Sequence, residues 1–459
     1  MKRNINLITA VSIVVTNMIG MGILTTPGVL SSYLTSSGQI MLVWIFGGIV
    51  ALLGAVVYGQ MAGLMPHSGG EFHYLSRLYH PRLGIAAGWV SIIAGFAGPV
   101  ALSAMAFAKY FLNLPFANQL FGHTISIEFS EKIIAFLLIL MLSSFHLFRK
   151  TNALNFQLLL TILLIVLLLL ISFLGFNYNH DVVREGLQSK FSGHQQNFGM
   201  ALLIAIYSYT GWNASCYFAG EIRNPKRNLP LSLLLGVSLV MVLYLAVNYG
   251  LLKVLGVSKL GGQIDFLSEL GNQLSGRLGS QLISATVLVI LLASISSMIY
   301  TGSRIPLLKK SSIHQHYPEL GRKGILKMYG LQSAIAILLI LFTGFQQLLM
   351  ILTLLLTLFT ILTAFGIFLL PWRRLKVSRT QEILVKTSAT ILLVILVWLV
   401  ANSISGLNYT VFWILMIVFS AIIGLFFFSR LRSYRNKSLM NQLKTRNIKI
   451  INQLNINNI

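Results

Sequence analysis

The amino-acid sequence predicts an all-α protein that crosses a membrane about twelve times. Of its 459 residues, 56% are hydrophobic and only 10% are charged, which is more apolar surface than a soluble fold of this size can hide. The hydrophobic residues form runs long enough for membrane helices of ~20 residues, rather than the alternation over ~10 residues that marks outer-membrane strands. The expected spans are 6–33, 39–65, 83–112, 132–148, 156–176, 197–220, 230–255, 278–308, 325–343, 346–370, 384–402 and 409–429.

The basic residues indicate how these spans are oriented. If the N-terminus lies inside, most of the 34 lysine and arginine residues fall on the inner side, which is the bias of cytoplasmic loops. We therefore expect a multi-pass protein of the plasma (inner) membrane with both termini in the cytoplasm. The net charge of +24 follows this distribution, so it does not indicate a nucleic-acid partner. The outer side and its helix ends hold Lys109, Lys132, Arg184, Lys190, Lys253, Lys259 and Arg277.

The loops are short, so we predict a single transmembrane domain over residues 1–429. Within it, residues 1–176 and 196–370 would form two halves of five spans each, followed by two extra helices at 384–429. A basic, asparagine-rich cytoplasmic tail is expected at 430–459.

Two spans carry helix-breaking residues near the middle of the membrane. The first contains TNMIGMGILTTPG (16–28), with Gly20-Met21-Gly22 at half depth, and the sixth contains Ser208-Tyr209-Thr210-Gly211. Interrupted spans at matching positions of two halves are typical of transporters built from inverted repeats. Close packing of helices through small residues is the alternative explanation of Gly20 and Gly22.

The backbone groups freed by such breaks predict the chemistry of a binding site. The N–H groups of Met21, Gly22 and Ile23 begin the outer half of the first span, where the positive helix end favours a carboxylate. Carbonyl groups at the ends of the neighbouring half-helices favour an ammonium group. A place that offers both kinds of group suits a zwitterion such as an α-amino acid. The expected carbonyl groups are those of Ile19, Tyr207 and Ser208.

The acidic residues support a site made of backbone groups. All ten fall in expected loops or at helix ends, so none is expected to act as a buried counter-ion. A charged substrate would then be held mainly by peptide dipoles, and the pocket for its side chain would be neutral and apolar. The ten residues are Glu71, Glu128, Glu131, Asp181, Glu185, Glu221, Asp265, Glu269, Glu319 and Glu382.

The sequence offers no constellation for metal binding or catalysis. The chain has one cysteine, Cys216, which lies in a hydrophobic span. A single cysteine excludes an intrachain disulfide, and the sequence contains no zinc-type cluster. The spans contain no nucleophile–base pair. We therefore expect no cofactor, no metal and no enzymatic activity.

Three motifs follow one another along the chain. They are IGMGILTTP (19–27), PHSGGEFHYL (66–75) and, in the sixth span and the loop after it, YSYTGWN (207–213) followed by Glu221 and NPKRNLP (224–230). In this order and spacing they resemble the amino acid–polyamine–organocation superfamily, and in particular its L-amino-acid-transporter branch. The family patterns are Ile-Gly-x-Gly-Ile-Phe-x-x-Pro, Pro-x-Ser-Gly-Gly-x-Tyr-x-Tyr-Leu and aromatic-Ala-Tyr-x-Gly-Trp-Asn with Asn-Pro-x-Arg-Asn-Leu-Pro. Phe72 replaces a tyrosine of the second pattern.

This resemblance implies the LeuT-type fold, a five-plus-five inverted repeat with discontinuous helices 1 and 6. It implies that the three amides named above hold the substrate carboxylate, and it adds Thr210 to the carbonyl groups that hold the ammonium. Tyr207 matches the aromatic residue that caps the substrate on its outer side. Trp212 and Asn213 follow the break; core packing explains Trp212 as well as pocket lining does.

The chain also departs from its relatives in ways that bear on coupling. The fifth span (156–176) contains no lysine, although some members place one there in the role that sodium has in others. Asn213 stands where many proton-coupled relatives carry an acid. Both departures favour exchange of amino acids or facilitated flux over proton symport. A sodium site through Ser294, Ser296 or Ser297 stays open, although serines in helices usually bond to their own backbone.

The leading prediction is an amino acid permease that works by alternating access on neutral, apolar L-amino acids. The alternatives are a proton- or sodium-coupled amino acid symporter, a carrier of cationic amino acids or polyamines, and a transporter-like nutrient sensor without flux. The expected partners are the amino acid substrate and the lipid bilayer, with no nucleic acid. An accessory subunit or an oligomer is left open.

Overall fold

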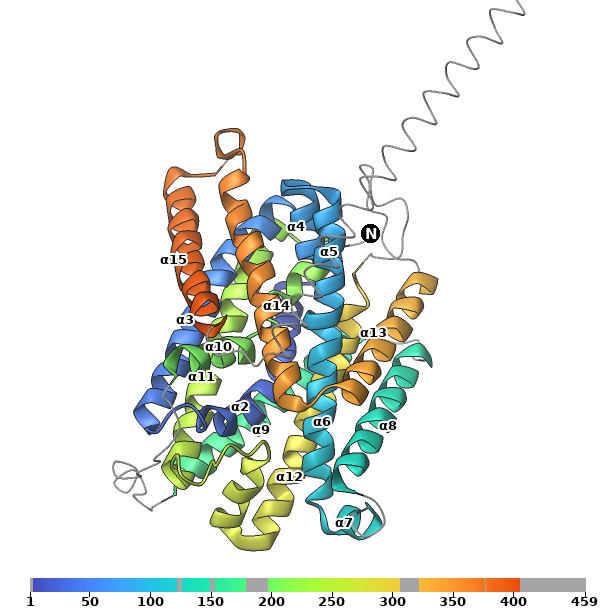
Figure 1. Ribbon diagram of the computed structural model, residues 1–459. Helices are drawn as coiled ribbons and strands as arrows, with labels where there is room; N and C mark the ends of the chain where they lie inside the picture. The colour runs from blue at the N-terminus through green and yellow to red at the C-terminus, as the bar shows by residue number, and fades with distance from the viewer. Residues whose placement is uncertain are drawn as a thin grey trace, which may run out of the picture. The chain divides into compact units, whose positions relative to one another are not determined.

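The computed structural model describes residues 3–121, 126–148, 153–178, 197–305, 322–375 and 377–404, and this part of the chain is helical (Figure 1). The first half contains α1 (Leu7–Met18), α2 (Met21–Leu30), α3 (Ser37–Leu64), α4 (Glu71–Leu78), α5 (Pro81–Val90), η1 (Ser91–Ala97), α6 (Gly98–Leu112), α7 (Pro115–Phe121), α8 (Ile127–Phe148) and α9 (Ala153–Phe176). The second half contains α10 (Phe198–Ser208), η3 (Ala214–Phe218), α11 (Pro225–Leu255), α12 (Phe266–Gly302), α13 (Arg322–Phe342), α14 (Phe345–Phe365) and η4 (Gly366–Leu369). They are followed by η5 (Trp372–Arg374) and α15 (Arg379–Ile404).

Nine helical segments within the described ranges are long and apolar enough to cross a membrane, which confirms the prediction of an all-α polytopic membrane protein. The expected sixth span is not among the nine because it is broken into α10, of 11 residues, and a short 3₁₀ helix. The expected fourth span is the 22-residue helix α8, which is also not among them. The expected span 409–429 and the tail 430–459 lie outside the described residues.

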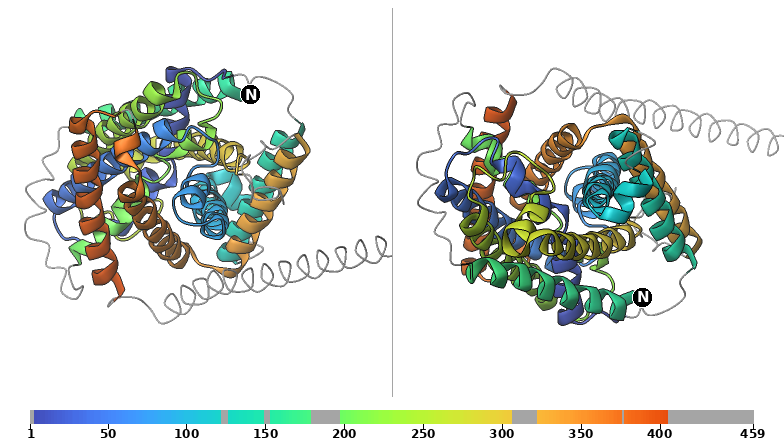
Figure 2. Two further views of the ribbon diagram at one scale, coloured as in Figure 1. Left: turned by 90° about the horizontal axis from the view of Figure 1, so that it is seen from above. Right: turned by 90° about the horizontal axis from the view of Figure 1, so that it is seen from below.

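The helices pack in the pairs that an inverted repeat requires. Helices that occupy equivalent positions in the two halves contact each other: α3 packs on α11, α6 on α12 and α8 on α13. Other contacts come in matching sets, because α1 packs on α11 as α10 packs on α3, and α1 packs on α9 as α10 packs on α14. Figure 2 shows α8 and α13 side by side from both ends of the bundle. This arrangement sets α1–α2 and α10–η3 at equivalent positions.

Several helix starts follow directly from the sequence. The side chains of Asn6, Ser36 and Asn197 each accept a hydrogen bond from a backbone N–H in the first turn of the helix they precede, which is the preferred role of such residues. Asn224 adopts a left-handed conformation with φ 46°, and Pro225 occupies the first turn of α11. Proline is suited to that position because its missing N–H needs no partner there.

The third span is irregular on the N-terminal side of Pro99. Residues Ser91–Ala97 form a π-helix, and the N–H of Gly98 donates to the carbonyl of Ile93. Proline lacks an N–H and its ring conflicts with the carbonyl four residues earlier. The wider turn of a π-helix accommodates this conflict, so the span continues through η1 into α6.

One side of the bundle is closed by contacts of the N-terminal segment. Ile5 forms a backbone bridge with Ile222, and the N–H of Gly220 donates to Oγ of Ser68 at 3.1 Å. These contacts bring together segments that lie far apart in the sequence. We give the name N-terminal face to the side formed by residues 3–6, 66–70 and 219–223.

On the other side of the bundle, α2 is held by the segment that leads into α12. The hydroxyl of Tyr110 lies 3.2 Å from the carbonyl oxygens of both Leu24 and Ile264 and can donate its one hydrogen to either. The N–H of Gly262 donates to Oγ of Ser31 at 3.0 Å. The outer half of the first span is therefore packed against α6 and the 260–265 loop.

Candidate functional site

The first span breaks where the glycines predict it. Helix α1 ends at Met18, Ile19 is extended with ψ 114°, and α2 begins at Met21 after Gly20. We call residues 19–20 the first break. The prediction that this span is interrupted is therefore confirmed.

The two glycines at the first break allow close approach of other helices. A Cβ atom on Gly20 would lie 2.4 Å from Oγ of Ser294 on α12, and one on Gly22 would lie 2.8 Å from Cα of Ser208 on α10. Both distances are far shorter than a van der Waals contact. Gly22 has no room for a side chain because its neighbour is backbone, whereas a side chain at Gly20 would require the hydroxyl of Ser294 to move. Close packing, the alternative explanation of these glycines, is thus present together with the break.

The sixth span breaks directly after Ser208, where α10 ends. We call residues 209–213 the second break. Thr210 turns the chain back, because its N–H and its Oγ1 both donate to the carbonyl of Tyr207, at 2.8 and 2.6 Å. Gly211 has φ 94°, a left-handed conformation that glycine adopts without strain.

The two breaks face each other at close range. A Cβ atom on Gly211 would lie 2.4 Å from the carbonyl oxygen of Asn17, so only glycine fits there. The hydroxyl of Tyr244 on α11 reaches both helix ends, donating to the carbonyl of Met18 at 2.6 Å and lying 3.3 Å from that of Ser208. Tyr244 was not among the predicted site residues, because it lies in an otherwise apolar stretch of its helix.

The predicted carboxylate-binding amides are available in the structure. Met21, Gly22 and Ile23 begin α2, so their N–H groups have no acceptor four residues earlier within the helix. In the described part of the chain, no acceptor outside α2 bonds to these three N–H groups. These N–H groups lie at the N-terminal end of α2, which is the positive end of the helix dipole, as the sequence predicts.

The four predicted carbonyl groups divide into two sets. The carbonyl groups of Ile19 and Thr210 accept no hydrogen bond from the described residues outside regular helices. The carbonyl of Tyr207 already accepts two bonds from Thr210, and that of Ser208 lies within reach of the Tyr244 hydroxyl. An ammonium group would therefore meet Ile19 and Thr210 without displacing an existing bond.

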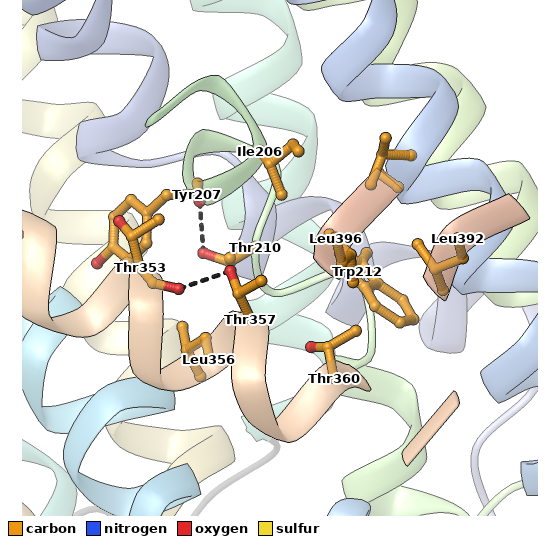
Figure 3. A pocket seen from close by; sticks show the side chains of 12 residues that line it. Ile206, Tyr207, Thr210, Trp212, Thr353, Leu356, Thr357, Thr360, Leu392 and Leu396 are labelled. Atoms are coloured by element: carbon orange, nitrogen blue, oxygen red, sulfur yellow. Dashed lines mark hydrogen bonds between the residues drawn. The ribbon is translucent and has the colours of Figure 1, made fainter. Parts of the chain in front are cut away.

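Two cavities flank the second break. The first encloses about 420 Å³ between α3, the end of α10, α14 and α15. Figure 3 shows its lining, with threonines of α14 opposite Tyr207 and Thr210. The second encloses about 570 Å³ and lies between the second break, α1, the third span and α14. The residues that line both are Thr210, Trp212, Leu356 and Thr360.

The predicted site residues divide between these cavities and the packed interior. Tyr207 lines the first cavity and Asn213 lines the second, whereas Thr210 and Trp212 line both. Trp212 is 8% exposed and packs edge-on against the ring of Tyr58, so it is at once a packed and a lining residue. Neither cavity is lined by the other five predicted residues, which are Ile19, Met21, Gly22, Ile23 and Ser208.

One acidic residue is buried, contrary to the expectation drawn from the sequence. Glu71 is 3% exposed and lines the second cavity. Its Oε1 accepts a hydrogen bond of 2.6 Å from the hydroxyl of Tyr58. Burial raises the pKa of Glu71 to about 7, although hydrogen bonds from Tyr58 and Ser91 act in the opposite direction. The pocket is therefore not lined by neutral groups alone.

The serines of α12 that left a sodium site open are in different surroundings. The side-chain nitrogen of Asn17 donates to Oγ of Ser297 at 3.0 Å and to Oγ1 of Thr301 at 3.1 Å. Oγ of Ser296 bonds to the ring of His146, and that of Ser294 has no hydrogen-bond partner among the residues that the structure describes. The side-chain amide of Asn17 thus donates into the pair of hydroxyls formed by Ser297 and Thr301.

Comparisons with known proteins identify the family of this chain. A family model described as amino acid permease matches residues 5–428. Serine/threonine exchanger SteT of Bacillus subtilis (strain 168) is 27% identical over 307 residues, which are 66% of this chain and 67% of that protein. The human b(0,+)-type amino acid transporter 1 is 27% identical over 263 residues, which are 57% of this chain and 53% of that protein.

A third relative is amino acid transporter protein 6 of Caenorhabditis elegans, 27% identical over 315 residues, which are 66% of this chain and 58% of that protein. The chain thus spans between 53% and 67% of the length of these three relatives. All three are named as transporters or exchangers and none as an enzyme, in line with the expectation of no enzymatic activity. On the match of the family model over nearly its whole length, the chain belongs to the amino acid permease family.

Proposed function

We propose that this protein carries neutral, apolar L-amino acids across the membrane by alternating access, through exchange or facilitated flux. The substrate carboxylate would bind the N–H groups of Met21, Gly22 and Ile23. Its ammonium would bind the carbonyl groups of Ile19 and Thr210. Those of Tyr207 and Ser208 would join only after giving up their contacts with Thr210 and Tyr244.

The observation that carries the proposal is the meeting of the two breaks. In the described part of the chain, the N–H groups at the start of α2 have no acceptor outside α2, and the carbonyl groups of Ile19 and Thr210 accept no bond from outside regular helices. The close approach of Gly211 to the backbone of Asn17 brings the second break against the end of α1. We propose that these groups face one common site. Unpaired backbone groups are costly within a membrane, so they persist only where protein or a cavity covers them. A zwitterion satisfies both kinds of group at once.

The substrate side chain would extend into the cavities beside the second break. Tyr207, Trp212 and Asn213 contribute to these cavities, and most of the remaining lining is apolar. Because Gly22 is packed on Ser208, we propose that substrate binding moves the start of α2 away from the end of α10. Such a movement at a fixed midplane site is the basis of alternating access.

Exchange or facilitated flux is favoured over ion coupling by the residues near the breaks. Helix α9 contains no lysine, Asn213 is not an acid, and the amide of Asn17 donates to Ser297 and Thr301. One relative is named as a serine/threonine exchanger, which supports exchange. We further propose that the N-terminal face lies in the cytoplasm and that the protein works in the plasma (inner) membrane, because the basic residues favour that side.

Ligand binding tests the site without any substitution. A thermal-shift screen of the purified protein against the twenty L-amino acids and polyamines first identifies ligands, because a ligand raises the stability of the folded state. The best amino acid is then compared with its N-acetyl and its carboxamide derivatives. Each loses one charged end, so we expect about 10- to 150-fold weaker binding, from the ~1.5–3 kcal/mol of a hydrogen bond to a charged group. Equal affinity for either derivative would contradict the site.

Flux in proteoliposomes separates the proposed function from its alternatives. Preloading with unlabelled neutral amino acid should accelerate uptake of the labelled one with no ion gradient. Uptake that requires a sodium or proton gradient would instead indicate a symporter, and preference for lysine or a polyamine would indicate a cationic carrier. Binding without any flux would indicate a sensor.

A further inference from the structure

The buried carboxyl group of Glu71 is not used by the proposed binding of the two substrate ends. It lies at the N-terminal end of α4, next to the loop 66–70 that belongs to the N-terminal face. It nevertheless lines the second cavity together with Asn17, Gly211 and Asn213, which belong to the two breaks or adjoin them. A group that alternates between charged and neutral forms thus borders the space proposed for the substrate.

The immediate partners of Glu71 are hydroxyl groups. Tyr58 of α3 donates to its Oε1, and the hydroxyl of Ser91 on η1 lies close enough to lower the pKa of Glu71. Ser91 in turn accepts a bond of 3.2 Å from the hydroxyl of Tyr217. Within the described ranges, no lysine, arginine or histidine nitrogen forms a salt bridge with Glu71. Its charged form therefore depends on these hydroxyls and on water in the cavity.

Apart from His67, in the loop before α4, the titratable groups near Glu71 keep one charge state near neutral pH. Tyr58, Cys216 and Tyr217 interact electrostatically with it, and tyrosine and cysteine are ordinarily neutral at pH 7. Burial, together with His67 and Arg77, lowers the pKa of His73 on α4 to about 3. Helices η1 and α14 carry no titratable residue. The titratable or charged groups on the elements around Glu71 and in the loop before α4 are Tyr58, His67, His73, Tyr74, Arg77, Arg82, Cys216 and Tyr217.

We propose that Glu71 takes up a proton when a neutral amino acid fills the second cavity, so that the affinity for substrate depends on pH. This proposal rests on the proposed function, because it requires the substrate to occupy that cavity. A substrate side chain displaces water that solvates the carboxylate, and a neutral side chain brings no positive charge to replace it. Desolvation without a counter-ion favours the protonated form.

Thermodynamic reciprocity then fixes the sign of the effect. If binding promotes protonation, protonation promotes binding, so affinity falls as the pH rises. Burial raises the pKa of Glu71 to about 7 in the empty cavity, which places the change in the physiological range. If only the protonated form binds, the apparent Kd is divided by the protonated fraction, and it should rise about tenfold between pH 6 and pH 8.

The test measures binding of L-leucine to the purified full-length protein by isothermal titration calorimetry at pH 6, 7 and 8. We expect a Kd that rises about tenfold over this range and, from buffers of different ionisation enthalpy at pH 8, uptake of about one proton per leucine bound. Glu71→Gln should bind with a Kd that is independent of pH and should take up no proton. Glu128→Gln, a change at an exposed carboxyl on α8, should retain the behaviour of the unmodified protein and serves as the matched control.

Three outcomes would overturn the proposal. They are a pH-independent Kd in the unmodified protein, a tenfold pH effect that persists in Glu71→Gln, and L-lysine binding that strengthens with pH in the unmodified protein and is lost in the variant. The third outcome would mean that Glu71 pairs with a cationic substrate.

If Glu71→Gln fails to fold, the number of protons taken up by the unmodified protein still decides. Leucine binding without proton uptake would contradict the proposal. If neither L-leucine nor any other L-amino acid binds at any pH, the proposed function itself is wrong.

Discussion

The hydroxyl of Tyr244 should hold the two breaks together, and Tyr244→Phe removes it with little other change. The ring is fully buried and packs on Trp44 and Tyr209 at centroid distances of 5.4 and 5.0 Å. Phenylalanine keeps these ring contacts. What is lost is the donor to the carbonyl of Met18 at 2.6 Å and to that of Ser208 at 3.3 Å.

The magnitude follows from the position of these carbonyl groups. Met18 and Ser208 are the last residues of α1 and α10, so their carbonyl groups have no donor within the helix. Leaving a buried acceptor without a donor costs about 1–3 kcal/mol, above the ~0.6 kcal/mol average of hydrogen bonds between membrane helices. We expect the free energy of unfolding to fall by about 1–3 kcal/mol, with weaker amino acid binding because the breaks are less fixed.

Tyr209→Phe is the matched control. Its hydroxyl is also buried and donates at 3.0 Å to the carbonyl of Trp44, but that carbonyl lies inside α3 and can accept a helical bond as well. The control should lose only about 0.5–1.5 kcal/mol, the net value of an ordinary hydrogen bond. Both variants are unfolded by denaturant in detergent micelles and followed by tryptophan fluorescence. If Tyr244→Phe is no less stable than Tyr209→Phe, the bridging role is refuted.

Three further predictions concern the surroundings of the site. Gly211→Ala should lower the free energy of unfolding by at least ~1–3 kcal/mol, because Gly211 has a φ of 94° and the added Cβ would meet the carbonyl of Asn17. Gly330→Ala is the control: Gly330 has open space around it, so alanine should raise the free energy of unfolding by ~0.5–1 kcal/mol. A Gly211→Ala protein of normal denaturation midpoint would count against the close contact of the breaks. Exchange in proteoliposomes should proceed at an unchanged rate when choline replaces sodium, because the hydroxyls of Ser297 and Thr301 on α12 already accept hydrogen bonds from the amide of Asn17. A rate that falls sharply without sodium would disprove this prediction. The guanidinium of Arg304 lies 3.8 Å from the carboxylate of Glu221. In the double variant Arg304→Gln/Glu221→Gln, the loss of unfolding free energy should therefore be smaller than the sum of the two single losses by ~0.5 kcal/mol or more. Equal values would show that the pair is not coupled.

The sequence predicted the breaks because helix breaking is a local property. Gly20, Gly22 and Gly211 mark it, and the matching positions of the two spans in their halves made the inverted repeat recognisable. The amides at the start of α2 follow from the position of the break alone. Which carbonyl groups stay free could not be predicted, because that depends on a local turn at Thr210 and on a hydroxyl from α11.

Tyr244 and Glu71 were missed for different physical reasons. Nothing in the apolar stretch around Tyr244 indicates which neighbours its hydroxyl meets, since that depends on how α11 packs on α1 and α10. Glu71 was expected in a loop or at a helix end and not as a buried group; it does begin α4, yet Glu71 through Ser76 are all buried. The aromatic and apolar residues Phe72, Tyr74 and Leu75 beside it were the available signal for burial.

The most direct test of the account is an experimental structure of the protein with a neutral L-amino acid bound. The account predicts the substrate carboxylate within hydrogen-bond distance of the N–H groups of Met21, Gly22 and Ile23, and the ammonium at the carbonyl groups of Ile19 and Thr210. An amino acid held instead by ionised side chains, or bound away from the two breaks, would contradict it.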